Sequence, residues 1–175
     1  MSTDTNIISK LNDAMGEIDY GWVDKNGARH EKLSGFSDLY ALQLPNELRE
    51  SKLGVCWDQV ELERDILTQN NVATDAYFIV YYDDNKCPTH TFILFENKGK
   101  TVWYEHAWEK HRGWYEFAST NEALREVREK FIAMELAGVD LDWNKLCIYK
   151  YPAPTKKLGC LEFYKHCEAG ENIVP

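Results

Sequence analysis

In the segment that follows Cys56, the apolar positions have the spacing of a helix: Val60, Leu62, Ile66 and Leu67. Asp58 would lie in the first turn of this helix, where a carboxylate complements the positive end of the helix dipole. The pair Asn70-Asn71 is a typical C-terminal stop. We therefore predict a helix whose first turn contains, or directly follows, Cys56.

The clearest helical pattern is STNEALREVREKFIAMELAG, at residues 119–138. Ser119 and Glu122 have the spacing of a capping box, and Gly138 follows the last apolar residue. The expected buried face consists of Leu124, Val127, Phe131 and Leu136. Shorter helices are predicted at residues 7–15, after Pro45, and in the segment LGCLEFYKHCEAG, which ends at Gly170.

Aromatic and β-branched residues dominate four other segments, which predict strands: DAYFIVYYDD, HTFILFE, TVWYEHAWE and KLCIYKYPAP. Asn97-Lys98-Gly99-Lys100 separates the second and third segments and is a strong tight-turn signal, so these two should form an antiparallel hairpin. A weaker hairpin is predicted around Asn26-Gly27. Helices and mostly antiparallel strands in separate runs predict an α+β fold.

Composition favours one compact domain over residues 1–175. The chain is 44% hydrophobic and 13% aromatic, with a formal charge of -9, so its average surface would repel a nucleic-acid backbone. No stretch approaches the roughly 20 apolar residues that span a bilayer. The first residues lack the basic and then apolar order of a signal peptide, so we expect a cytoplasmic protein with neither nucleic acid nor membrane as partner.

The chain has an odd number of cysteines and no export signal, which favours free thiols over a disulfide framework: Cys56, Cys87, Cys147, Cys160 and Cys167. Cys87 and His90, with the pair His166-Cys167, could be combined into a zinc site. The paired CxxC spacing that is typical of structural zinc sites is missing, so we expect no metal and no other cofactor.

The predicted hairpin brings two titratable residues together. With a two-residue loop at Lys98 and Gly99, Phe92 lies opposite Glu105, so that His90 and Glu105 share one face as diagonal neighbours. His106 would point to the other face. A change of one residue in the loop would reverse this choice, and His106 or Glu109 would then be the relevant neighbour of His90.

These residues are the components of thiol catalysis. A helix N-terminus and a protonated imidazole favour a thiolate at Cys56, and a carboxylate at Glu105 would fix the tautomer of His90. In acyl transfer Cys56 would attack a carbonyl, His90 would protonate the departing amine, and the backbone N–H of Cys56 would stabilise the oxyanion.

The order G54-V55-C56-W57-D58, then H90-T-F-I-L-F, then W103-Y-E105-H-A-W resembles the core of the transglutaminase-like superfamily of papain-type cysteine enzymes. The resemblance covers about residues 45–117, with N- and C-terminal elaborations. It implies a nucleophile helix packed on an antiparallel sheet, with Cys56 as nucleophile, His90 as general base and Glu105 as third member. It also implies a peptide or protein substrate that carries an amide, and it leaves protease, amidase and transglutaminase activities open.

Two features depart from the family pattern. The third position is usually Asp in the family, whereas this chain has Glu105, whose longer side chain can still accept the imidazole N–H. Papain-like relatives also place a Gln a few residues before the nucleophile as an oxyanion donor. Here the region reads ELRESKLGVC, with no Gln after Gln43, so the second donor is unassigned.

Simpler interpretations exist for each of these residues. Cys56 alone would be a core residue, His90 alone an edge histidine, and Glu105 alone a solvated carboxylate at a strand end. The tryptophans could line a substrate groove, although packing is the default: Trp57, Trp103, Trp108 and Trp114. The acidic residues of VELERD should form a solvated helix face. The alternative function is a catalytically inactive fold that binds a peptide or protein; the sequence does not indicate the oligomeric state.

Overall fold

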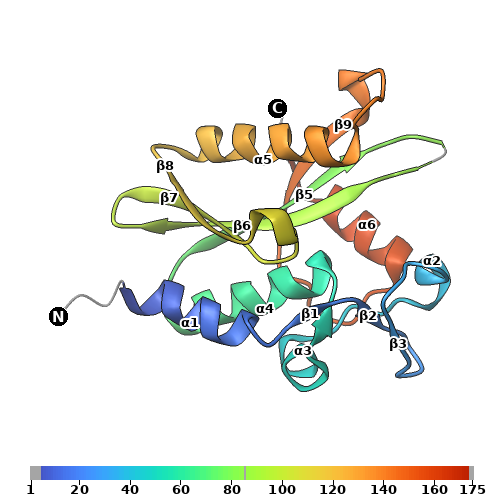
Figure 1. Ribbon diagram of the computed structural model, residues 1–175, viewed down its shortest axis with the longest axis horizontal. Helices are drawn as coiled ribbons and strands as arrows, with labels where there is room; N and C mark the ends of the chain where they lie inside the picture. Colours follow the sequence, from blue (N-terminus) through green and yellow to red (C-terminus); the bar gives the residue numbers. More distant parts are fainter. Residues whose placement is uncertain (1–4, 85, 174–175) are drawn as a thin grey trace.

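The computed structural model describes residues 5–84 and 86–173. At its centre lies a six-stranded antiparallel sheet in the order β10-β9-β5-β6-β7-β8 (Figure 1). Its strands are β5 (Thr74–Tyr81), β6 (Thr89–Asn97), β7 (Lys100–Glu105), β8 (Gly113–Phe117), β9 (Leu146–Tyr151) and β10 (Glu171–Ile173). The predicted α+β character is therefore confirmed.

Helices cover both faces of the sheet (Figure 1). One face packs against α5 (Thr120–Glu135). The other face packs against α1 (Thr5–Met15), α4 (Cys56–Gln69) and α6 (Cys160–Glu168). The remaining elements are α2 (Phe36–Leu39), α3 (Pro45–Ser51), two 3-10 turns (Glu109–His111 and Trp143–Lys145), and the short strands β1 (Asp19–Tyr20), β2 (Trp22–Val23), β3 (Arg29–His30) and β4 (Leu53–Gly54).

Helix α5 begins where its capping signal predicts. The Ser119 hydroxyl accepts the backbone N–H of Glu122 at 3.3 Å. The Glu122 carboxylate accepts the N–H of Ala118 at 3.0 Å, one residue before the expected partner. Both bonds satisfy backbone donors at the start of the helix, which explains why α5 begins at Thr120.

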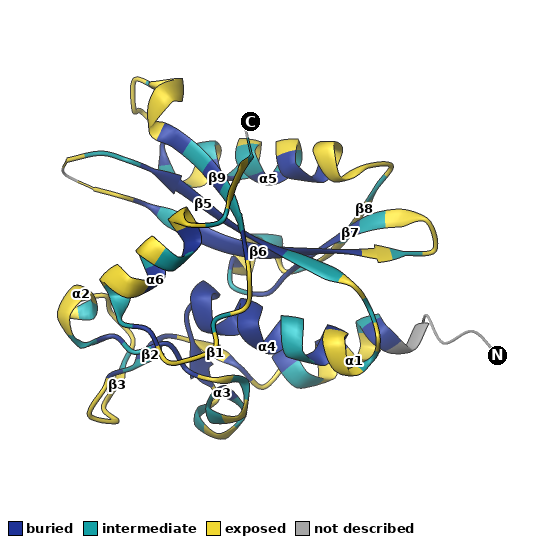
Figure 2. Ribbon diagram, turned by 180° about the vertical axis from the view of Figure 1, so that it is seen from behind, coloured by how far each residue is buried: buried dark blue, intermediate teal, exposed yellow. Residues whose placement is uncertain are grey.

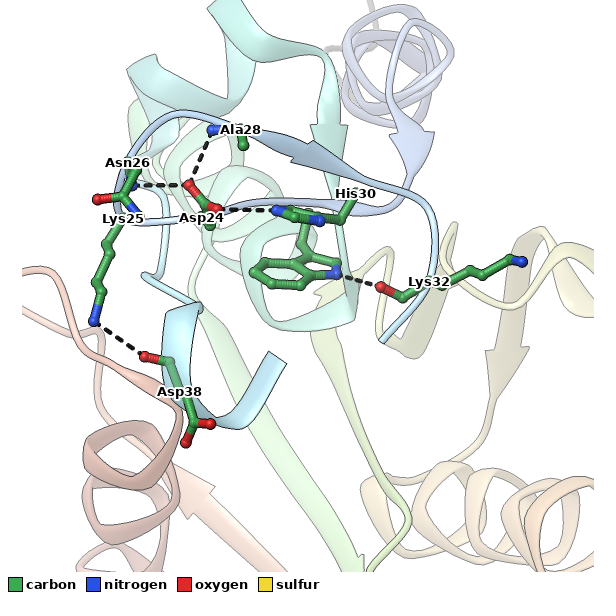
Figure 3. A network of polar contacts seen from close by, with 8 residues as sticks. Asp24, Lys25, Asn26, Ala28, His30, Lys32 and Asp38 are labelled. Atoms are coloured by element: carbon green, nitrogen blue, oxygen red, sulfur yellow. Dashed lines mark hydrogen bonds and ion pairs between the residues drawn. The ribbon is translucent and has the colours of Figure 1, made fainter. Parts of the chain in front are cut away.

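The predicted N-terminal hairpin is also present, as the antiparallel pair β2 and β3. Asp24 organises its turn, because one carboxylate oxygen accepts the N–H groups of Asn26 at 2.8 Å and Ala28 at 2.9 Å. The other oxygen lies 3.0 Å from His30 Nε2, and the His30 ring stacks on Trp22 (Figure 3). This network accounts for the stability of a hairpin whose strands are very short.

Two strands of the central sheet, β8 and β10, escaped prediction. The segment TVWYEHAWE leaves the sheet after Glu105, turns through residues 106–112 and returns as β8, which pairs with β7. Strand β10 has three residues. Both are edge strands with exposed positions, so they lack the continuous apolar runs that identify β5 and β6.

Helix α4 is buried more deeply than its polar sequence suggests (Figure 2). It packs against β6 as well as α1 and α3, and Glu61 and Glu63 are both buried. The prediction that VELERD forms a solvated face is therefore wrong for these two residues. No helix in the described part of the chain is long and apolar enough to cross a membrane.

Candidate active site

Cys56 is the first residue of α4. It follows β4, which pairs in parallel with β1, so the chain enters the helix from a fixed backbone. Gly54 is required by close packing at this point. A Cβ at Gly54 would lie 2.7 Å from Leu48 Cδ1 and 3.0 Å from Asp58 Cβ. The first N–H groups of a helix have no partner within it, so the N–H of Cys56 has no acceptor inside α4.

The β6-β7 hairpin has the predicted register. Asn97 pairs with Lys100, and Lys98 and Gly99 form the two-residue turn with positive φ at both positions. His90 and Glu105 consequently share a face, and His90 Nε2 lies 2.8 Å from Glu105 Oε2. This contact is sealed from solvent, since the two residues are only 1% and 3% exposed.

Trp108 completes the support of this pair. Its backbone N–H donates to the second Glu105 oxygen at 2.8 Å. Its indole stacks on the His90 ring, with centroids 3.7 Å apart and an interplanar angle of 12°. Trp108 thus fixes both the carboxylate and the imidazole, a role that its aromatic character alone did not reveal.

The Cys56 side chain also lies close enough to His90 to raise the pKa of the imidazole. Because Nε2 is engaged by Glu105, Nδ1 is the ring nitrogen left for the thiol. Burial disfavours the charged imidazole, but the Glu105 carboxylate and the neighbouring Cys56 side chain outweigh it, so that the pKa of His90 rises to about 10. His90 is therefore protonated at neutral pH.

The other residues considered as neighbours of His90 are placed elsewhere. His106 points away and lies with Nε2 3.0 Å from the carbonyl oxygen of Ile18. Glu109 is exposed in the 3-10 turn. The structure thus brings together Cys56, His90 and Glu105, in the order helix, strand, adjacent strand.

Gln43 does not supply an oxyanion donor. Its side-chain nitrogen donates to the Leu53 carbonyl at 2.7 Å, and its side-chain oxygen accepts the Ser51 hydroxyl at 2.6 Å. It fixes the approach to β4 rather than facing the Cys56 thiol.

The burial of two acids near the site was not predicted from the sequence. Asp58 is fully buried at the start of α4. Burial, and then the Glu105 carboxylate, raise the pKa of Glu63 well above its usual range. Each lies in a segment dense in charged residues, so the sequence carried no signal that distinguished them from solvated neighbours.

The residues of the alternative zinc site do not converge. Cys87 is exposed, Cys167 is fully buried, and His166 Nε2 lies 2.8 Å from the Pro152 carbonyl oxygen. Among residues 5–84 and 86–173, no group of three or more His, Cys, Asp or Glu side chains is arranged to hold a metal ion.

Comparison with known proteins gives no family assignment. No protein-family model matches the chain, and no curated protein matches its sequence.

Proposed function

We propose that this protein is a thiol-dependent acyl-transfer enzyme of the transglutaminase-like class, with a papain-like core. The observation that carries the proposal is the 2.8 Å contact between Glu105 and His90, together with Cys56 at a helix N-terminus, close enough to raise the pKa of that imidazole. In such an arrangement the thiol is the nucleophile, the imidazole carries the proton, and the carboxylate orients the imidazole.

The chemistry follows from these positions. Cys56 Sγ attacks the carbonyl carbon of an amide, and the backbone N–H of Cys56 donates to the oxyanion that forms. The C–N bond then breaks, and the proton on His90 passes to the leaving amine, which leaves a thioester at Cys56. Water or a second amine attacks the thioester, gives its proton to His90, and releases the thiolate.

A second candidate function is a binding module that keeps the fold without catalysis. Burial favours it, since Cys56 is 6% exposed and His90 only 1%. An amide substrate has to displace covering residues before it reaches the thiol. The two functions differ in whether the thiol of Cys56 is activated.

The first prediction concerns alkylation of Cys56 by iodoacetamide as a function of pH, followed by peptide mass spectrometry. We expect Cys56 to be alkylated faster than Cys160 at acid and neutral pH, and His90→Ala to abolish this difference. Cys160 is an internal control, because it too is the first residue of a helix. Burial raises the pKa of the Cys160 thiol, so it should need alkaline pH.

The contrary result is equally clear. If Cys56 reacts at acid pH no faster than Cys160, and His90→Ala changes nothing, the enzyme proposal fails and the binding module becomes the better interpretation.

A further inference from the structure

Asp58 connects the start of α4 to a distant segment of the chain. It is the third residue of the helix, is fully buried, and accepts hydrogen bonds from three donors. One oxygen accepts the Tyr40 hydroxyl at 2.8 Å and the backbone N–H of Gln43 at 2.9 Å. The other accepts the N–H of Val55 at 3.0 Å, directly before Cys56. The carboxylate therefore fixes the turn that carries the thiol.

This arrangement costs stability. Burial raises the pKa of Asp58 to about 7, although the bonds from Gln43, Tyr40 and Val55 all favour the ionised form. At neutral pH the folded protein must therefore either keep the Asp58 carboxylate charged without water around it, or keep it protonated. Such costly buried acids concentrate at functional sites, and this one lies two residues from the proposed nucleophile.

We propose that Asp58 is a positioning residue, whose ionised carboxylate holds the first turn of α4 so that the Cys56 thiol stays in contact with His90. The inference rests on the proposed function of Cys56. Protonation removes the charge that strengthens all three bonds and occupies one acceptor position, which loosens the turn. The reactivity of Cys56 thereby becomes dependent on pH through a residue that never contacts the substrate.

The titratable groups that face Asp58 are Tyr40, Tyr20 from β1, and Glu61 one turn along α4. Burial raises the pKa of the Tyr40 phenol, and partial burial together with neighbouring acidic groups raises that of Tyr20, so both stay protonated near neutral pH. Glu61 is held separately by Arg64, at 3.1 Å, and by the Tyr151 hydroxyl. Among these groups, Asp58 is the one that accepts a hydrogen bond from the backbone directly before Cys56, the N–H of Val55.

Our second prediction uses Asp58→Asn. The amide retains one acceptor oxygen, but its nitrogen cannot accept a second donor. We expect the alkylation rate of Cys56 at about pH 8 to fall roughly tenfold, the effect of losing one charge-assisted bond. The deficit should close below about pH 6, where Asp58 of the wild type is protonated as well. Asp65→Asn is the matched control, because Asp65 lies on the same helix and pairs with Arg49 instead.

Tyr40→Phe provides an independent test that keeps the carboxylate. Loss of the hydroxyl removes one donor to the ionised form, so the pH at which the alkylation rate rises should move upward. Tyr82→Phe is its control, since the Tyr82 hydroxyl also donates to a carboxylate, that of Glu168, on an exposed surface.

The proposal is overturned if Asp58→Asn reacts at the wild-type rate at about pH 8, or if its deficit is the same at all pH values. An unshifted profile in Tyr40→Phe would also overturn it. A wild-type thiol that is indifferent to His90→Ala refutes the proposed function instead, whichever result the Asp58 variant gives.

Discussion

His90 holds its proton inside the protein because the neighbouring groups outweigh the cost of burial. Glu105 is the strongest of these groups, and it lies 2.8 Å from Nε2. Our third prediction is that Glu105→Gln lowers the pKa of His90 from about 10, because the largest charge that opposes the effect of burial is removed. Titration of the imidazole resonances by NMR measures this shift.

Glu109→Gln is the control for this experiment, since Glu109 is exposed in the turn that follows β7. It should leave the His90 titration unchanged. A His90 that titrates identically in the wild type and in Glu105→Gln would show that the carboxylate does not hold the proton.

At the scale of elements, the hairpin shows what the sequence could predict. The register depends on the turn Asn97-Lys98-Gly99-Lys100. A glycine at this position of a hairpin predicts a two-residue turn from the local sequence alone, and the structure shows the positive φ angles that such a turn requires. Side-chain alternation then placed His90 beside Glu105. The contact of Trp108 with both residues could not be predicted, because it depends on the path of an irregular turn.

Helix α4 shows the opposite case. Its start at Cys56 was predictable from local signals, but the burial of Glu61 and Glu63 was not. A helical pattern indicates one buried face, whereas α4 lies between the sheet, α1 and α3 and is covered on several sides. Burial of this kind depends on the arrangement of whole elements, which the local pattern does not contain.

The fourth prediction concerns the entry to α4. Gly54→Ala should destabilise the protein by about 1 to 3 kcal/mol, because the new methyl group overlaps Leu48 and Asp58. Gly159→Ala is the matched control. Gly159 lies directly before α6, as Gly54 lies two residues before α4, but a Cβ at Gly159 meets its nearest neighbour at 3.7 Å, an ordinary contact. Urea unfolding measures both, and equal small effects would contradict the packing at Gly54.

At the scale of the whole molecule, the buried titratable groups set how stability depends on pH. Asp58 and Glu63 have raised pKa values, so the folded protein keeps protons that the unfolded chain loses, and stability falls as pH rises. The stabilising contribution of His90 is present below pH 6.5 and is lost as pH rises through about 10. His106, whose pKa burial lowers, opposes this trend at acid pH.

The fifth prediction isolates one of these groups with Glu63→Gln. The variant should match the wild type near pH 4.5, the ordinary pKa of a glutamate. Above that pH the unfolding free energy of the variant should exceed that of the wild type by about 1.4 kcal/mol more for each pH unit, until Glu63 ionises in the folded wild type. Urea unfolding at several pH values measures the gain. The exposed Glu129 gives the control Glu129→Gln, and a gain independent of pH would contradict the prediction.

The turn at Lys98 and Gly99 constrains how this chain can change over evolutionary time. Substitutions there are tolerated as long as the positive φ angles are kept. An inserted or deleted residue, in contrast, would turn Glu105 away from His90 and bring His106 into its place. Related sequences can therefore differ in the residues of the turn, provided that these adopt positive φ angles. The number of residues in the turn must stay constant as long as His90 and Glu105 are kept as a pair.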